Sequence, residues 1–277
     1  MRKQTNNEKK NMPLKSRKIM FFDIDGTLVE SGKDTIDEDV LAAIQKARKN
    51  GHLMFINTGR TLSNLSEYLL TAGFDGYICA CGTYIILDGD TILYHHTPDE
   101  VCRLVKEMSA KHDLDIIYES WHGIYFDPGE LKTAAGAGLA SELSGLYRVF
   151  KYIPDEGFNF DKFITWNREG SDLKGFIDSV SAHYDYIDRG NGFSEFVPKG
   201  FSKATGIQFV LDRLGLDIKD AHAVGDSTND LPMLTCVPHS IAMGNSDPKS
   251  LFDMVEYVTT DIDKNGIINA LTHYGFI

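Results

Sequence analysis

The sequence predicts an α/β fold, in which a doubly wound parallel sheet forms the core and an α+β segment is inserted into it. Three short apolar runs, each followed by a polar loop that contains glycine, predict strands of this sheet: residues 19–22, 53–56 and 221–224. Such runs are typical of parallel strands, because these are buried on both faces. Segments with helical spacing of apolar residues alternate with the runs, over residues 36–49, 62–72 and 203–214. This alternation is the pattern of βαβ units.

The pattern changes after Thr83. Residues 84–87 and 91–94 flank the turn Asp88-Gly89-Asp90 as a hairpin, and 98–112 has apolar residues on one helical face. The remaining segments predict strands at 114–118, 123–126, 163–166, 184–188 and 193–197, and helices at 130–143 and 173–183. We therefore expect a core at residues 18–83 and 193–277, an inserted domain at 84–192, and a disordered basic tail at 1–17.

Two carboxylates follow the first apolar run. Asp23 and Asp25 are two residues apart, so on an extended chain they project from one face and converge where the strand ends. Two such anions repel unless a proton or a hard cation lies between them, and an all-oxygen site suits Mg²⁺. Gly26 allows the tight turn that follows.

Two further strands end in polar loops. The second run continues into Asn57-Thr58-Gly59-Arg60, and the third into Gly225-Asp226-Ser227-Thr228-Asn229-Asp230. Lys203 opens the amphipathic stretch 203–214, which puts an ammonium group at a helix N-terminus. Because ligands of open α/β sheets bind outside the carboxyl ends of the strands, these loops are expected to be neighbours.

Taken in order, these motifs resemble those of the haloacid dehalogenase-like phosphohydrolases. The matched residues are Asp23 to Thr27, Thr58 to Arg60, Lys203, and Gly225 to Asp230. The C-terminal part, with Ala-Met-Gly-Asn at 242–245 and Asp-Lys-Asn-Gly-Ile at 263–267, is similar to the Cof-type group. The resemblance implies a Rossmann-like core with a large inserted α+β cap of type IIB. The chain departs from the group's common residues at Asn57 and at Cys81-Gly82-Thr83.

The resemblance also implies roles in catalysis and metal binding. Asp23 matches the nucleophile that forms an aspartyl-phosphate, and Asp25 matches the general acid and base. Mg²⁺ is expected to bind the carboxylates of Asp23 and Asp226 and the main-chain carbonyl of Asp25.

Further matched positions are expected to hold the substrate's phosphoryl group. These are Thr58, the Gly59 amide, Lys203 and Asn229. Asp230 is expected to play a supporting part, by orienting Lys203 or a metal-bound water. Each residue taken alone also fits a turn or a helix cap, so the joint occurrence carries the prediction.

Composition limits the partners. The formal net charge of −12 argues against nucleic acid and against an acidic membrane surface. The four cysteines form neither a disulfide framework nor a CxxC pair, which favours reduced thiols and a cytoplasmic location. No apolar run reaches the length of about 18 residues that a membrane span needs. A monomer or a small homo-oligomer is expected.

The predicted function is that of a Mg²⁺-dependent phosphatase for small phosphorylated metabolites, foremost sugar phosphates, with nucleotides, FMN or pyridoxal phosphate as other substrates. The inserted domain is expected to select the substrate, with His122 and Arg189 as candidate contacts. One alternative is a phosphomutase of the phosphomannomutase type, which would transfer the phosphoryl group to a second sugar hydroxyl. A non-catalytic metabolite-binding protein is another, although such a protein needs neither a nucleophile nor an acid.

Overall fold

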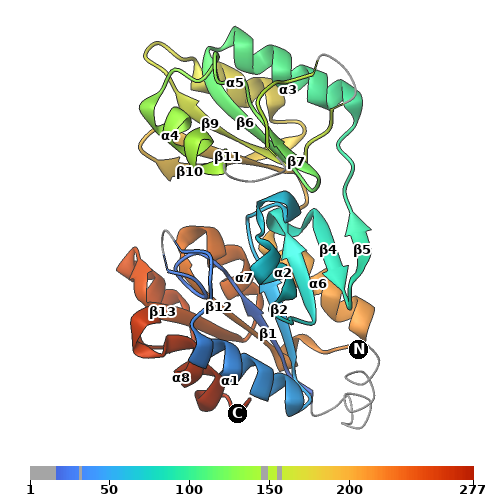
Figure 1. Cartoon of the computed structure of the whole chain (residues 1–277), viewed down its shortest axis with the longest axis vertical. Helices are drawn as coiled ribbons and strands as arrows, with labels where there is room; N and C mark the ends of the chain where they lie inside the picture. The colour runs from blue at the N-terminus through green and yellow to red at the C-terminus, as the bar shows by residue number, and fades with distance from the viewer. Residues whose placement is uncertain (1–16, 31–32, 145–148, 155–157) are drawn as a thin grey trace. The chain divides into compact units, whose positions relative to one another are not determined.

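The computed structural model describes residues 17–30, 33–144, 149–154 and 158–277, so the expected tail at 1–17 lies almost wholly outside the described residues. The chain divides into two compact units, each with its own sheet (Figure 1). We call Met1–Gly59, Ser66–Ile92 and Ser202–Ile277 the core unit. Arg60–Leu65 and Leu93–Phe201 form the inserted unit.

An eight-stranded sheet forms the core unit, in the order β14-β13-β12-β1-β2-β3-β4-β5. Its strands are β1 Ile19–Phe22, β2 Leu53–Asn57, β3 Gly76–Cys79, β4 Tyr84–Leu87, β5 Asp90–Tyr94, β12 Ala221–Ser227, β13 His239–Asp247 and β14 Tyr257–Val258. β1 lies inside the sheet, where Ile19 pairs in parallel with Leu53 of β2 and with Ala221 of β12. Every residue of β1 is buried, as its unbroken apolar run requires.

Helices cover both faces of the core sheet (Figure 1). They are α1 Glu38–Lys49, α2 Glu67–Thr71, α6 Lys203–Leu214, α7 Leu231–Cys236 and α8 Gly266–His273. α1 packs beside α8, and α6 packs beside α7. Short 3-10 helices complete the unit: η4 Ala80–Gly82, η5 Ile218–Asp220, η6 Thr228–Asp230, η7 Lys249–Met254 and η8 Ile262–Lys264. The α/β class with a doubly wound core is confirmed.

The inserted unit contains a six-stranded sheet in the order β10-β11-β9-β6-β7-β8. Its elements are η3 Leu62–Asn64, α3 Asp99–Lys111, β6 Leu114–Ser120, β7 Gly123–Tyr125, α4 Ala134–Leu143, β8 Val149–Phe150, β9 Lys162–Asn167, α5 Leu173–Val180, β10 Tyr184–Gly190 and β11 Phe193–Pro198. Successive residues of a strand face opposite sides. Phe163 therefore packs into an aromatic core with residues of α3 and α5, whereas Ile164 packs with residues of α4.

The boundaries between the units differ from the expected 18–83, 84–192 and 193–277. The 84–94 hairpin extends the core sheet, because Ile86 of β4 pairs with Tyr77 of β3. β11 belongs to the inserted unit, because Phe196 pairs with Phe163 of β9. The segment Arg60–Leu65 joins the same unit, where Ser63 Oγ donates to the carbonyl oxygen of Ser120 at 2.5 Å. Local sequence patterns do not report these pairings, since the partners lie elsewhere in the chain.

Two predicted helices differ from the structure because side-chain hydrogen bonds interrupt or delay them. The segment 62–72 divides into η3 and α2, because Ser66 has an extended backbone and its hydroxyl caps α2 by accepting from the Leu69 amide. The segment 130–143 begins its helix only at Ala134. The amides of Lys132 and Thr133 donate instead to the carboxylate of Asp115.

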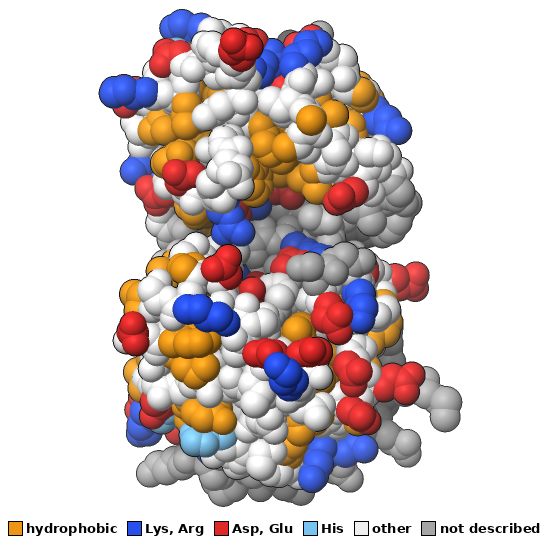
Figure 2. Space-filling view, turned by 90° about the vertical axis from the view of Figure 1, so that its left-hand side faces the viewer, with side chains coloured by type: hydrophobic (Ala, Val, Ile, Leu, Met, Phe, Trp, Pro, Cys, Tyr) orange, Lys and Arg blue, Asp and Glu red, His pale blue; other side chains and the backbone are white. Residues whose placement is uncertain are grey.

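Acidic and basic side chains are interspersed over the face shown in Figure 2. Within the described ranges, no helix combines the length and the apolar character that crossing a membrane requires.

Candidate active site

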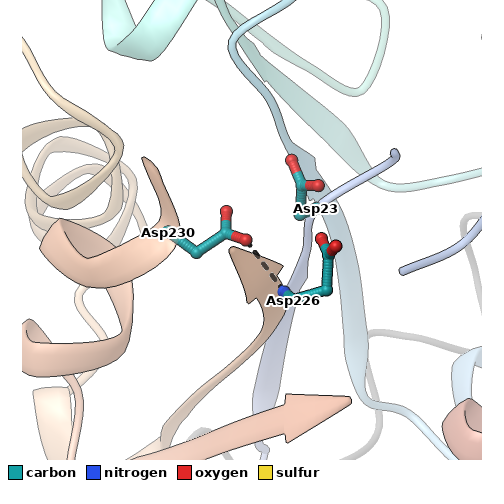
Figure 3. Close-up of side chains that lie close together, drawn as sticks. All are labelled: Asp23, Asp226 and Asp230. Atoms are coloured by element: carbon teal, nitrogen blue, oxygen red, sulfur yellow. Dashed lines mark hydrogen bonds between the residues drawn. The ribbon is translucent and has the colours of Figure 1, made fainter. Parts of the chain in front are cut away.

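The candidate site is built around Asp23, the first residue after β1. The Asp23 amide donates to the carbonyl of Val224 on β12 at 3.0 Å, so the chain stays beside β12 one residue beyond the strand. Only 4% of Asp23 is exposed. Its carboxylate faces that of Asp226, while Asp230 approaches from the side (Figure 3).

Lys203 joins two of these carboxylates. Its Nζ lies 2.5 Å from Asp23 Oδ1 and 2.6 Å from Asp230 Oδ1. Lys203 is the first residue of α6, and a reciprocal pair of bonds between Ser202 and Thr205 fixes where that helix begins. Because only 1% of Lys203 is exposed, its charge depends on these two ion pairs.

Asp230 also shapes the loop that follows β12. Its Oδ2 accepts hydrogen bonds from the amides of Asp226 at 2.9 Å and Ser227 at 3.1 Å. A Cβ atom at Gly225 would lie 2.5 Å from Asp230 Cγ, so this position needs glycine. The loop therefore closes around the Asp230 carboxylate and directs Asp226 toward Asp23.

The Asp226 carboxylate lies against the turn that follows Asp23. Thr27 Oγ1 donates to Asp226 Oδ1 at 3.3 Å. Gly26 has φ of +80°, and a Cβ there would come within 2.2 Å of Asp226 Oδ2. Only glycine tolerates both the left-handed backbone and this approach. Oxygen atoms from Asp23, Asp226 and Asp230 all lie within 4.8 Å of one another, a spacing at which carboxylates can share one cation.

Negative charge exceeds positive charge in this group. Asp23 and Asp230 raise the pKa of Lys203 despite its burial, so the lysine stays charged. One lysine does not balance three carboxylates. Burial, and then the charge of Asp230, raise the pKa of Asp23 to about 8 and that of Asp226 to about 7. An all-oxygen group with surplus negative charge fits a hard divalent cation such as Mg²⁺.

Comparison with known proteins agrees with this geometry. Residues 20–271 match the model of the haloacid dehalogenase-like hydrolases. The chain belongs to this family. YkrA of Bacillus subtilis is 27% identical over 94% of this chain and 98% of its own length, and the HMP-PP phosphatase of Yersinia enterocolitica is 25% identical over 93% and 95%. The structure of BT4131, a sugar phosphatase of HAD subclass IIB, is 25% identical with a TM-score of 0.78, covering 94% of this chain and 100% of that one.

These similarities confirm the expected Cof-type assignment within the haloacid dehalogenase-like family and the class of phosphoric monoester hydrolase. The relatives act on different substrates, since one is an HMP-PP phosphatase and another is a sugar phosphatase. The substrate of this chain is therefore a separate question from its family.

Four residues expected from the family's motifs lie outside the carboxylate group. Asp25 is exposed, and its main chain forms a bridge with Val29. Thr58 is buried just beyond β2, with its amide bonded to the Ile78 carbonyl at 2.9 Å. Gly59 follows it. Asn229 accepts from Ser227 Oγ at 2.5 Å, within the loop after β12.

Asn57, one of the departures from the group's common residues, connects β2 to α6. Its Nδ2 donates to the main-chain oxygen of Lys203 at 3.0 Å. Asn57 therefore adds a hydrogen bond to the main chain of Lys203.

The two candidate substrate contacts of the inserted unit differ in their surroundings. Both ring nitrogens of His122 have partners, Ser120 Oγ at 2.8 Å and Tyr125 OH at 2.9 Å. These bonds favour a structural role for His122. Arg189 NH1 lies 3.9 Å from Glu195 Oε2, and part of its side chain is exposed.

Sequence reasoning missed Thr27 and Asn245 as contributors to the site. Asn245 lies on β13, and its Nδ2 donates to the carbonyl of Gly26 at 2.8 Å. The rule that polar residues at strand ends gather at one edge of the sheet could have identified it, because an apolar run precedes Asn245 as one precedes Asp23.

Proposed function

We propose that this chain is a cytoplasmic, Mg²⁺-dependent phosphatase that hydrolyses small phosphorylated metabolites, foremost sugar phosphates, through an aspartyl-phosphate on Asp23. The observation that carries the proposal is the buried Lys203 between Asp23 and Asp230, beside a third carboxylate. A set of this kind provides a nucleophile, a fixed positive charge and a cation site at one sheet edge. Phosphoryl transfer depends chiefly on such positioning and charge neutralisation.

Asp23 acts as the nucleophile in the first step. Lys203 holds Oδ1 of Asp23, which leaves the other oxygen to attack phosphorus in line with the leaving group. The new bond between Asp23 and phosphorus forms while the bond from phosphorus to the substrate oxygen breaks. The leaving oxygen takes a proton from Asp25.

The second step regenerates the enzyme. Asp25 accepts a proton from a water molecule, and this water attacks the phosphorus of the aspartyl-phosphate. The bond between Asp23 and phosphorus breaks, inorganic phosphate leaves, and Asp25 is protonated again for the next cycle. The exposed position of Asp25 allows it to exchange protons with water.

The residues that would hold Mg²⁺ are Asp23 and Asp226 through their carboxylates, and Asp25 through its main-chain carbonyl. When bound, Mg²⁺ supplies positive charge against the carboxylates and the phosphoryl oxygens. Asp230 acts by holding Lys203 and the Asp226 amide.

The phosphoryl oxygens are held by Thr58, the Gly59 amide and Lys203, with Asn229 in support. These contacts are local, and they act against the repulsion that a protein of net charge −12 exerts on an anionic substrate. The inserted unit selects among substrates by the part that carries the phosphate. Substrate specificity and the chemical step therefore depend on different parts of the chain.

The test is release of inorganic phosphate by the full chain from a panel of sugar phosphates, nucleotides, FMN, pyridoxal phosphate and an aryl phosphate. We expect activity with Mg²⁺, none with EDTA, and recovery when Mg²⁺ is restored. Asp23→Asn is the matched control. Equal release in EDTA, or by this variant, would overturn the proposal. Transfer of the phosphoryl group to a second sugar hydroxyl, with no free phosphate, would replace it with the phosphomutase alternative.

A further inference from the structure

Asn245 connects two loops of the core unit. Its Nδ2 donates to the carbonyl of Gly26, and its Oδ1 accepts from the amide of Ile262, each at 2.8 Å. Gly26 belongs to the turn after β1, and Ile262 begins η8. One side-chain amide on β13 therefore uses a donor and an acceptor to join the two loops.

The peptide that Asn245 holds lies next to the Asp226 carboxylate. Its carbonyl belongs to Gly26 and its amide to Thr27, and this amide donates to Ile24 O at 3.2 Å. Thr27 then donates its hydroxyl to Asp226 Oδ1. The orientation of this one peptide thus decides where the Thr27 hydroxyl reaches Asp226.

The turn after β1 borders a cavity. The residues that line this cavity of about 400 Å³ include Thr27 and Leu28 of the turn and Ile262 and Asp263 of η8. Gly26, which lacks a Cβ, has wide backbone freedom. Main-chain hydrogen bonds from the Gly26 amide to Val29 and from the Thr27 amide to Ile24 hold the turn. The bond from Asn245 to the Gly26 carbonyl adds a restraint from outside the turn.

We propose that Asn245 is a positioning residue for the metal site: by holding the Gly26–Thr27 peptide it keeps Thr27 on Asp226 and so sets the affinity for Mg²⁺. The inference rests on the proposed function, because it assumes that Asp226 binds Mg²⁺. Residues that orient a metal-binding carboxylate through hydrogen bonds typically change metal affinity by about 10- to 100-fold when they are removed.

The test is calorimetric titration of Mg²⁺ into the full chain without substrate. We expect Asn245→Ala to raise the Kd for Mg²⁺ about tenfold, at the low end of that range. At saturating Mg²⁺ the KM for an aryl phosphate should stay within about twofold, because the residues that hold the phosphoryl group are unchanged. Thr27→Val removes the same link at its other end and should raise the Kd similarly. The Kd of the double variant should not exceed the larger of the two single-variant Kd values, because both substitutions interrupt the same connection.

Asn269→Ala is the matched control. Asn269 donates to Thr260 Oγ1 at 2.7 Å, just before η8. Asn269→Ala therefore also removes a hydrogen bond that an asparagine side chain makes to this segment. If Asn245→Ala weakens Mg²⁺ binding no more than this control does, the inference is overturned. If Asn245→Ala fails to fold by circular dichroism, Thr27→Val decides, and an unchanged Kd there overturns it as well. Absence of Mg²⁺ binding by the unmodified chain would overturn the proposed metal dependence along with the inference.

Discussion

Each unit of this protein buries a lysine between two carboxylates. In the core unit, Lys203 lies 2.5 Å from Asp23 and 2.6 Å from Asp230. In the inserted unit, Lys162 lies 2.8 Å from Glu119 and 2.7 Å from Glu195. The distances are alike, but the first group lies at strand ends and loops, whereas the second lies across neighbouring strands.

The two groups differ in charge. Glu119 and Glu195 face Lys162, and Arg189 approaches Glu195, so positive and negative charges nearly balance. The adjacent Asp161 adds little charge below neutral pH, because burial raises its pKa to about 7. In the core unit, Asp226 is a third carboxyl group beside one lysine, and burial likewise raises its pKa to about 7. The balanced group needs no further ion, whereas the extra carboxyl group of the core unit must either hold a proton or bind a cation when it ionises.

The largest effect is expected for Asp23→Asn. Loss of the proposed nucleophile should lower turnover by more than about 1,000-fold. It also removes one of the surplus charges, so the unfolding temperature in EDTA should not fall. Phosphate release and thermal unfolding, measured on the same preparation, test both parts. A variant that is inactive only because it is unfolded would contradict the charge argument.

Lys162→Met should lower the stability of the inserted unit, in contrast to Asp23→Asn, which is expected not to lower stability. It leaves Glu119 and Glu195 buried without their cation, which should cost roughly 3–5 kcal/mol of unfolding free energy in the inserted unit. The chain has two tryptophans, and Trp121 and Trp166 both lie in that unit, so urea unfolding followed by fluorescence reports on it. Replacing both glutamates with glutamine as well should restore most of the loss. An unchanged midpoint would mean that the buried group contributes nothing.

Asp226→Ala should raise the Mg²⁺ concentration for half-maximal activity at least about tenfold, because it removes one proposed ligand. Ca²⁺ should support little activity, since its larger and looser coordination misplaces the nucleophile. Asp217→Ala, at an exposed carboxylate outside the site, is the control. An unchanged Mg²⁺ requirement would remove Asp226 from the ligand set.

The stabilisation of the fold by Mg²⁺ should increase with pH. The pKa of Asp226 is raised from 3.8 to about 7 in the folded chain, so its contribution to stability is complete below about pH 3.8 and is lost as pH rises through 7. Mg²⁺ is proposed to bind the ionised carboxylate, and its binding would oppose that loss. The increase in unfolding temperature caused by Mg²⁺ should therefore grow by roughly 2–4 °C from about pH 6 to about pH 8. Asp226→Asn should make this increase with pH smaller, and the part that remains is expected to come from Asp23, whose pKa is raised to about 8.

The smallest effect is expected for substrate choice. Arg189→Ala should change the relative rates among sugar phosphates by up to about tenfold and the rate with an aryl phosphate by less than about twofold. His122→Gln should change the relative rates less, because both ring nitrogens already have partners within their own hairpin. If all substrates slow equally, the inserted unit does not select among them.

Strand ends were the most predictable part of this protein. The apolar run 19–22 and the polar residues after it predict both β1 and the position of Asp23, because burial and register dictate both. Other features depend on distant partners. β11 resembles any half-buried strand until its pairing with β9 is known, and nothing near Asn245 in the sequence indicates the Gly26 carbonyl that it contacts.

The pairing of β1 with β12 has a consequence for synthesis. Ile19 pairs with Leu53 on one side and with Ala221 on the other, while the chain of the inserted unit lies between those two partners in sequence. During synthesis on a ribosome, the edge of β1 that pairs with β12 therefore stays unpaired while Leu93–Phe201 is made. That continuous stretch can form its own sheet before β12 is available. The three carboxylates meet only once Asp230 has left the exit tunnel, so catalytic competence is among the last properties that the growing chain acquires.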